Sequence, residues 1–175
     1  MGAMMSSSLI KIQEATASSS SSITLTGIDT TYNVYLVLFH GVVGSNDNVY
    51  LNMRSTVGGT ADDSSAYEWA GRVQSVGGFA NHYGSGQNHM RISDGTLGTG
   101  TSEFCNGYIW VLNANSSSQF TAYASNNAVR NSGATLSGTI SSFIHQEAQT
   151  TDGVYFYASS GNIASGQFTI YGLNK

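Results

Sequence analysis

Charged residues are scarce in this chain. Asp, Glu, Lys and Arg make up 9% of its 175 residues, against roughly 25% in an average soluble domain. The net charge is −4 and the six Lys and Arg residues are scattered, whereas a nucleic-acid site needs clustered basic side chains. We therefore expect no nucleic-acid partner. Ser, Thr, Asn and Gly supply the missing polarity, which gives a neutral, hydrogen-bonding surface.

Other features are missing as well. Cys105 is the only cysteine, so an internal disulfide is excluded, and its place before an apolar run predicts a buried, inert thiol. No apolar run approaches the ~20 residues that a membrane helix needs, so membrane insertion is not expected. Proline is absent, against an average usage of about 5%, and nothing in the sequence accounts for this.

Helical periodicity is almost absent, and short β-type runs recur in its place. They are rich in β-branched and aromatic residues and are separated by Gly, Ser, Asn and Asp. The pattern predicts an all-β, two-sheet sandwich. The expected strands are Leu9–Gln13, Ser22–Gly27, Asn33–His40, Asn48–Arg54, Tyr67–Val73, His89–Ser93, Gly107–Asn113, Gln119–Ala124, Gly138–Gln146, Val154–Ala158 and Gln167–Tyr171.

Loops are expected between these runs. Ser18–Ser22 reads as a polar connection, Ser55–Ala66 as an exposed loop, and Gly77-Gly78 and Gly84-Ser85-Gly86 as longer loops. Met1-Gly2-Ala3-Met4 has the character of a cloning remnant. We expect residues 1–5 to be disordered and residues 6–175 to form one domain.

Several expected strands are apolar on both faces. In Asn33–His40, one face carries Val34, Leu36 and Leu38, and the other carries Tyr35, Val37 and Phe39. A sandwich strand needs only one apolar face, and large exposed apolar patches are rare on monomers. A second copy of the chain is the expected cover, although tyrosines facing solvent are an alternative. The predicted contact residues are Tyr35, Val37, Phe39, Tyr155 and Tyr157.

A catalytic or metal site is not expected. His40 and His145 lie at or near strand ends, where a structural role is the default. A cluster of His82, His89 and Asp94 remains conceivable, but its spacing matches no ligand pattern. No Gly-x-Ser-x-Gly elbow supports a serine nucleophile. No phosphate-cradling loop opens a helix, so neither nucleotide binding nor a cofactor is expected.

Carboxylates for glycoside chemistry would have to come from Asp62, Asp63 and Glu68. Adjacent Asp residues in a Gly- and Ser-rich loop are more often solvated, and a calcium site at Asp62-Asp63 stays open as a minor alternative. A glycan-cleaving enzyme is the third of three hypotheses for the function.

A sugar-binding surface is the second hypothesis. Neutral loops rich in aromatic and amide side chains suit the hydroxyls and ring faces of sugars, although the aromatic residues of a strand are often core instead. The candidate ligand-binding residues lie within the segment 67–91 and are Tyr67, Trp69, His82, Tyr83, His89 and Arg91.

The two ends of the chain carry a family resemblance. The start contains Leu9-Ile10-Lys11-Ile12 and Ile23–Tyr35, and the end reads Ser160–Leu173, with the letters SGNIASGQFTIYGL. This pairing resembles a group of tailed-phage virion proteins, frequent in marine and cyanobacterial viruses, whose chains close on a similar "SGNI..G...LYG" ending. Here Ile170 stands where that ending has Leu. The middle of the chain resembles these proteins only in the spacing of its expected strands.

The resemblance implies a tail, fibre or capsid-decoration protein with an antiparallel, jelly-roll-like β-sandwich, often oligomeric. It carries no catalytic residues, because the shared motifs are structural. The first hypothesis is therefore a non-enzymatic structural protein of the virion, assembling as a homotrimer with other virion proteins. Its loops would serve attachment, and a host surface glycan is a conceivable ligand.

Overall fold

The computed structural model describes residues 8–174 and contains strands, turns and bends but no helix in that range. Thirteen strands form: β1 Leu9–Ser20, β2 Ile23–Thr26, β3 Val34–Gly44, β4 Leu51–Val57, β5 Thr60–Ala61, β6 Tyr67–Ser75, β7 Gly78–Gln87, β8 Met90–Arg91, β9 Phe104–Leu112, β10 Thr121–Arg130, β11 Leu136–His145, β12 Gly153–Ala158 and β13 Ile163–Leu173. The expected start at residues 1–5 lies outside the described residues.

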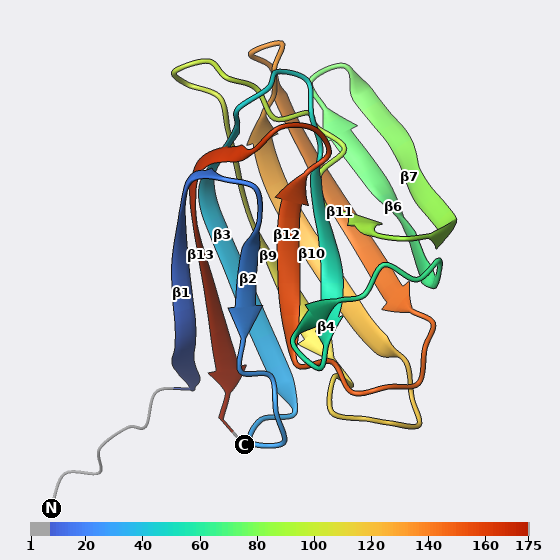
Figure 1. The fold of residues 1–175 in the computed structure, drawn as a ribbon. Coiled ribbons are helices and arrows are strands. Elements are labelled where there is room, and N and C mark those ends of the chain that lie inside the picture. Colours follow the sequence, from blue (N-terminus) through green and yellow to red (C-terminus); the bar gives the residue numbers. More distant parts are fainter. Residues whose placement is uncertain (1–7, 175) are drawn as a thin grey trace, which may run out of the picture.

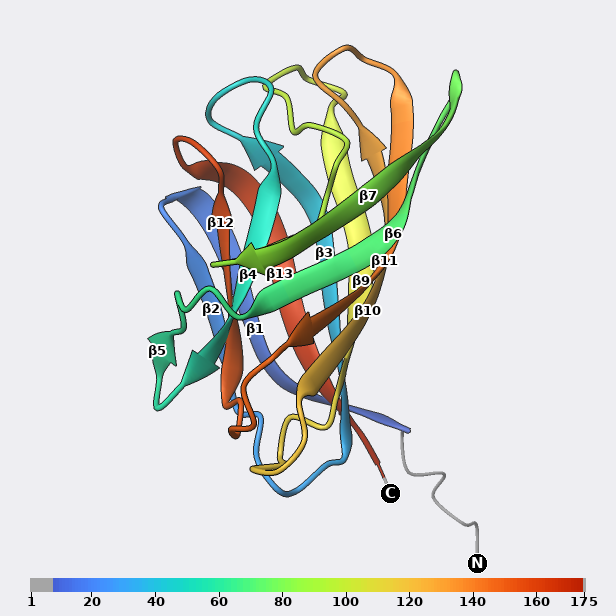
Figure 2. The ribbon, with the colours of Figure 1, turned by 90° about the vertical axis from the view of Figure 1, so that its right-hand side faces the viewer.

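The strands pair into two antiparallel sheets that pack as a jelly-roll-like sandwich (Figure 1). The larger sheet has the order β1-β13-β3-β9-β10-β11-β6-β7, and the smaller has the order β2-β12-β4-β5, with β8 paired to β4. The first and last strands are neighbours, since Leu9 pairs with Leu173 and Ser20 with Ile163. Figure 2 shows the two layers from the side, with β6 and β7 running past the edge of the smaller sheet.

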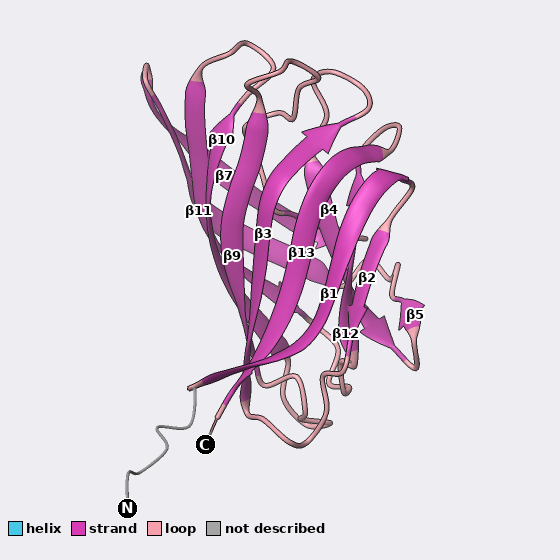
Figure 3. Ribbon diagram, turned by 90° about the vertical axis from the view of Figure 1, so that its left-hand side faces the viewer, coloured by secondary structure: helices cyan, strands magenta, loops and turns pink. Residues whose placement is uncertain are grey.

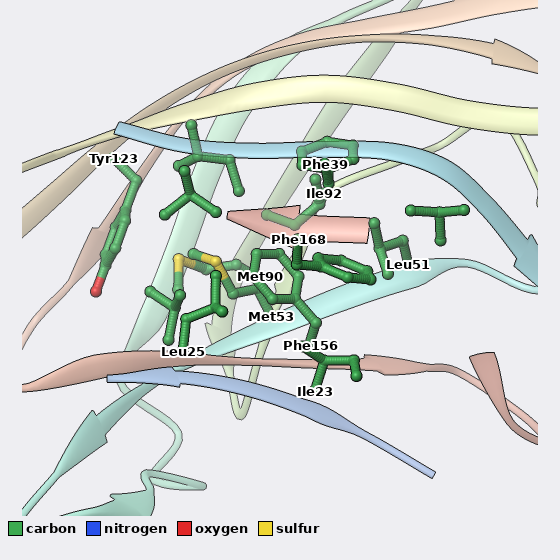
Figure 4. Packing of buried hydrophobic residues seen from close by; sticks show 14 of the residues in the cluster. Ile23, Leu25, Phe39, Leu51, Met53, Met90, Ile92, Tyr123, Phe156 and Phe168 are labelled. Carbon is green, nitrogen blue, oxygen red and sulfur yellow. The ribbon is translucent and has the colours of Figure 1, made fainter. Parts of the chain in front are cut away.

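One hydrophobic core fills the space between the sheets (Figure 4). Phe39 and Phe168 of the larger sheet meet Phe156 of the smaller one, with ring centroids 5.0–6.4 Å apart. Met53 and Met90 are fully buried beside them. Because strand side chains alternate between faces, the central strands of the larger sheet give alternate residues to this core, as β9 does with Ile109 and Val111.

This alternation corrects part of the interface prediction. Tyr35, Val37 and Phe39 of β3 point into the sandwich and are fully buried. They therefore cannot contact another subunit, and the prediction for these three residues was wrong. The same strand directs Leu36 and Leu38 to the other face of the sheet, where Leu38 is exposed and Leu36 is only 7% exposed. Strand periodicity alone does not say which of two apolar faces meets the opposite sheet.

The loop predictions needed correction in three places. The expected exposed loop Ser55–Ala66 begins within β4, where Ser55 and Thr56 are fully buried, and it contains the short strand β5. Strand β1 continues to Ser20 through most of the expected Ser18–Ser22 connection. Gly84-Ser85-Gly86 belongs to β7, and the tight turn between β6 and β7 is Val76-Gly77, with Gly78 as the first residue of β7. Glycine and serine are typical loop formers, but pairing with β13 for β1 and with β6 for β7 overrides their low strand propensity.

Candidate functional site

The outer face of the larger sheet is the most extensive surface feature. We use this term for the outward side chains of β3, β9, β10, β11, β6 and β7. Pairing places Leu38, Tyr108, Asn126 and Ile140 in one row across four strands. Leu38, Tyr108 and Ile140 are all exposed, with 47% of Ile140 open to solvent. In Figure 3 most of β3 and β9 is open to the viewer, and the start of β1 crosses their lower ends.

A second row of side chains runs parallel to the first. Its members are neutral and differ in size: Leu36, Trp110, Ala124, Ser142, Ala70 and Tyr83. Among the six strands, the only Asp, Glu, Lys or Arg residues are Glu68, Arg72 and Arg130. Charge is depleted at the centres of protein interfaces, so this composition is typical of a surface that becomes covered.

A shallow groove of about 580 Å³ lies at one side of the outer face. Phe79, Val76 and Leu136 line it, and Gly138 and Ala128 contribute to its lining with little side chain of their own. Phe79 has 77% of its surface exposed. The outer face therefore has bulky side chains on β3 and β9 and a hollow near β11, β6 and β7.

None of the contact residues predicted from the sequence lies on this surface, although some of the expected strands with two apolar faces do. The signal was present in the run Tyr108–Leu112, whose outward residues Tyr108, Trp110 and Leu112 alternate with the buried Ile109 and Val111. Only the strand order shows that β9 lies between β3 and β10, so that these side chains join Leu38 and Ile140 in one surface.

Three of the predicted ligand-binding residues are buried. Tyr67 and His82 lie in the interior, and Trp69 is only 6% exposed. The Trp69 ring packs against Phe143, with ring centroids 6.3 Å apart. Stacking on a sugar needs an accessible ring, so the prediction that these three residues form the binding surface was wrong. Tyr67 and Trp69 fill the core, which was the other interpretation of their strand.

The remaining three candidates divide between the two layers. Tyr83 stands on the outer face with 77% of its surface exposed, beside a groove of about 420 Å³ that Glu68, Ser85 and Ser142 also line. His89 is half-buried, and burial, with Arg91 and Arg54 nearby, lowers its pKa. The six candidates therefore do not converge on one site.

Arg91 is held by structural contacts. Its guanidinium lies 4.2 Å from the centre of the Tyr50 ring and donates a hydrogen bond of 3.0 Å to Asp94. The Nδ1 atom of His82 lies 3.7 Å from the same carboxylate, and its Nε2 atom lies 3.0 Å from the Arg91 carbonyl. His82 and Asp94 are thus neighbours, but His89 does not join them as a third metal ligand in the described part of the chain.

The carboxylates considered for glycoside chemistry do not converge either. Glu68 is on the outer face of β6, where it pairs with Ile144. Asp62 contacts His145, which lies on the inner face of the neighbouring strand β11. Asp63 is exposed. Among the described residues, the one group of three metal-capable side chains combines Asp62 and His145 with Glu147.

Tyr155 and Tyr157 lie on the outward side of the smaller sheet. Both are half-buried, their ring centroids are 5.7 Å apart, and Arg54 lies over the Tyr157 ring at 5.1 Å. Burial raises the pKa of Tyr157. A subunit contact through these two rings stays a prediction.

Comparison with family models, curated proteins and solved structures gave no significant match. Among residues 8–174, no helix has the length and apolar character needed to span a bilayer. The fold and the surface therefore define the protein as an antiparallel β-sandwich with a broad, nearly uncharged outer sheet face.

Proposed function

We propose that this protein is a non-enzymatic structural component of a phage virion that assembles as a homotrimer. The observation that carries the proposal is the outer face of the larger sheet, which is broad, exposes Leu38, Tyr108 and Ile140, and has few charged residues. Trimer contacts form through this face, and the loops at the ends of the sandwich stay free for attachment to other virion proteins or to the host.

The size of the face fits a stable contact. Strands spaced ~4.8 Å apart and rising ~3.3 Å per residue give the six-strand face an area of about 900 Å². Each partner in a standard-size interface buries roughly 800 Å². Burying the exposed parts of Leu38, Tyr108 and Ile140 would remove apolar surface from water, and this is the main driving force for association.

The shape of the face favours a second copy of the chain as its partner. The bulky side chains Leu38, Tyr108 and Trp110 lie at one side, and the groove beside Gly138 lies at the other. A head-to-tail contact would place the bulky side of one subunit in the hollow of the next, and such contacts form a closed ring when the rotation from one subunit to the next closes. With so few charges on the face, a strongly charged partner has little to recognise.

The virion setting is supported by the resemblance at the two ends of the chain. Residues of the SGNI ending make up the turn from β12 to β13, and the first and last strands pair along their length. The two resembling segments are thus neighbours in the fold. Labelling of intact phage particles with gold-conjugated antibodies against the protein tests this setting, and unlabelled particles would contradict it.

Light scattering coupled to size exclusion tests the assembly. The wild-type protein should have three times the chain mass, and the double variant Tyr108→Glu with Ile140→Glu should have the mass of one chain. Thr24→Glu is the control, because Thr24 pairs with Tyr155 in the smaller sheet. Near-ultraviolet circular dichroism establishes that each variant is folded.

Two outcomes would overturn the assembly proposal. A wild-type protein with the mass of one chain at working concentration would remove it. Dissociation by Thr24→Glu but not by the double variant would place the contact on the smaller sheet, beside Tyr155 and Tyr157.

Glycan binding is the second candidate function, and one observation favours it. The exposed Tyr83 ring stands beside a groove with the polar groups of Glu68, Ser85 and Ser142, which suits a sugar ring and its hydroxyls. A glycan array should then give signals that Tyr83→Ala removes and that Phe79→Ala, an equally exposed ring on the same strand, retains. Signals equal in both variants would count against this site.

A further inference from the structure

His145 is a buried side chain whose ring nitrogens have no hydrogen-bond partner. It is the last residue of β11, it is 0% exposed, and its ring stacks on Tyr67 with centroids 4.4 Å apart. Neither Nδ1 nor Nε2 makes a hydrogen bond. Buried polar atoms without hydrogen-bond partners cost free energy and are rare in folded proteins. The two ring nitrogens of His145 are therefore candidates for binding a ligand.

Two carboxylates lie next to this ring. The Oδ2 atom of Asp62 is 3.2 Å from His145 Nε2, within ion-pair distance but out of line for a hydrogen bond. One donor atom each from Asp62, His145 and Glu147 lie within 4.8 Å of one another. The three side chains come from the β5–β6 connection, the end of β11 and the β11–β12 connection, so folding brings them together.

The negative charge of this cluster is not balanced by basic residues. Among residues 8–174, no lysine or arginine forms an ion pair with Asp62 or Glu147. The Gln149 amide donates hydrogen bonds to both carboxylates, of 2.7 Å to Asp62 and 2.8 Å to Glu147. The two carboxylates thus share one polar N–H group, the Gln149 amide, in the position where a cation could also bind.

We infer that Asp62, His145 and Glu147 bind a divalent transition-metal ion of the Zn²⁺ type. Zn²⁺ takes imidazole nitrogen and carboxylate oxygen at about 2.0–2.2 Å, so two donors on one ion are at most about 4.4 Å apart. Donor atoms within 4.8 Å reach this spacing through small side-chain rotations. Ca²⁺ prefers oxygen ligands throughout and does not explain the imidazole.

Three hydrogen bonds fix the position of Asp62. Its backbone N–H donates to the Ser55 carbonyl at 2.9 Å, its carbonyl accepts from the Tyr67 hydroxyl at 2.9 Å, and its Oδ1 accepts from the Ser64 N–H at 2.9 Å. The other oxygen, Oδ2, is the one that faces His145. A bound ion would join two connections to the end of β11 and stabilise the folded state.

Titration calorimetry of the chelator-stripped, full-length protein with ZnCl₂ tests the site. One Zn²⁺ should bind per chain. Glu147→Gln should weaken binding at least roughly tenfold, since losing even a residue that only orients a ligand costs about 10- to 100-fold. Asp63→Asn is the matched control, because it removes the exposed neighbouring carboxylate. Glu147 lies on a partly exposed connection, so its variant keeps the fold.

Long-range ¹H–¹⁵N spectra of the four histidines supply a second readout. Zn²⁺ should shift a ring nitrogen of His145 and leave those of His40 unchanged. The proposal is overturned by any of three results: no heat of binding at millimolar Zn²⁺, equal weakening by Glu147→Gln and Asp63→Asn, or Ca²⁺ binding as tight as Zn²⁺. None of these results bears on the trimer, which forms through the opposite face of the sheet.

Discussion

The hydroxyl oxygen of Tyr123 lies 2.6 Å from the hydroxyl oxygen of Ser55, and both side chains are buried. Tyr123 belongs to β10 of the larger sheet and Ser55 to β4 of the smaller one, so this hydrogen bond crosses the sandwich. The Ser55 backbone N–H also donates to the Tyr67 hydroxyl at 3.2 Å. The two sheets are therefore joined by oriented polar contacts as well as by apolar packing.

Removing one partner of this bond should destabilise the fold. Tyr123→Phe should lower the free energy of unfolding by about 1–3 kcal/mol, because the Ser55 hydroxyl stays buried without a partner. Urea unfolding followed by circular dichroism measures the change. The double variant Tyr123→Phe with Ser55→Ala should lose less than the sum of the single variants. Strict additivity would mean that the two hydroxyls are not coupled.

Gly84 allows β7 to lie against the Trp69 ring. A Cβ atom at this position would come within 2.4 Å of the Trp69 side chain. Gly84→Ala should therefore lower the free energy of unfolding by about 1–3 kcal/mol through overpacking. Thermal unfolding provides the measurement.

Ser85→Ala provides the control for this prediction. Ser85 is the exposed neighbour of Gly84 on the same strand, and its change should stay within about 0.5 kcal/mol. If both variants lost the same stability, contact with Trp69 would not be the reason for the glycine.

This glycine also explains a limit of sequence-based reasoning. Gly84-Ser85-Gly86 has the composition of a loop, and only the packing of Trp69 shows why glycine occupies a strand there. The strands built from Val, Ile, Tyr and Phe, such as β3 and β12, were predictable because their composition and packing agree. The sandwich followed from these strands and their turns.

The functional surfaces were harder to predict, for a physical reason. Val37 and Leu38 are adjacent and equally apolar, but Val37 is fully buried and Leu38 is exposed. Which of the two meets the smaller sheet depends on contacts between residues distant in sequence. The same holds for His145, because its approach to Asp62 depends on pairing between β11 and β6. Hydrophobic patterning carries no information on such contacts.

Cys105 lies near the start of β9, and its reactivity tests how readily this part of the core opens to solvent. The side chain is fully buried, and burial raises the pKa of the thiol. Since the thiolate is the reactive form, a disulfide reagent should leave the native protein unlabelled and should label one thiol per chain in guanidinium chloride. Rapid labelling under native conditions would show that this part of the core opens readily.

Asp94 should make stability depend on pH in the acid range. The pKa of its carboxyl is lowered from an ordinary value of 3.8 by His82 first and by Arg91 as well, against the opposing effect of burial. A lowered folded-state pKa means that the unfolded chain binds a proton more readily. The stabilisation is therefore complete above about pH 3.8 and is lost as the pH falls from there through the folded-state pKa.

Comparing Asp94→Asn with the wild-type protein isolates this contribution. At pH 7 the variant should be less stable by about 1 kcal/mol, the upper end for partly exposed ion pairs. The difference should shrink as the pH falls below 3.8, because the wild-type carboxyl then becomes neutral too. Asp47→Asn, at an exposed loop position, controls for a general loss of negative charge. A stability difference between Asp94→Asn and wild type that stayed constant down to pH 2 would show that Asp94 acts through packing, because only an effect of its charge disappears when the carboxyl is protonated.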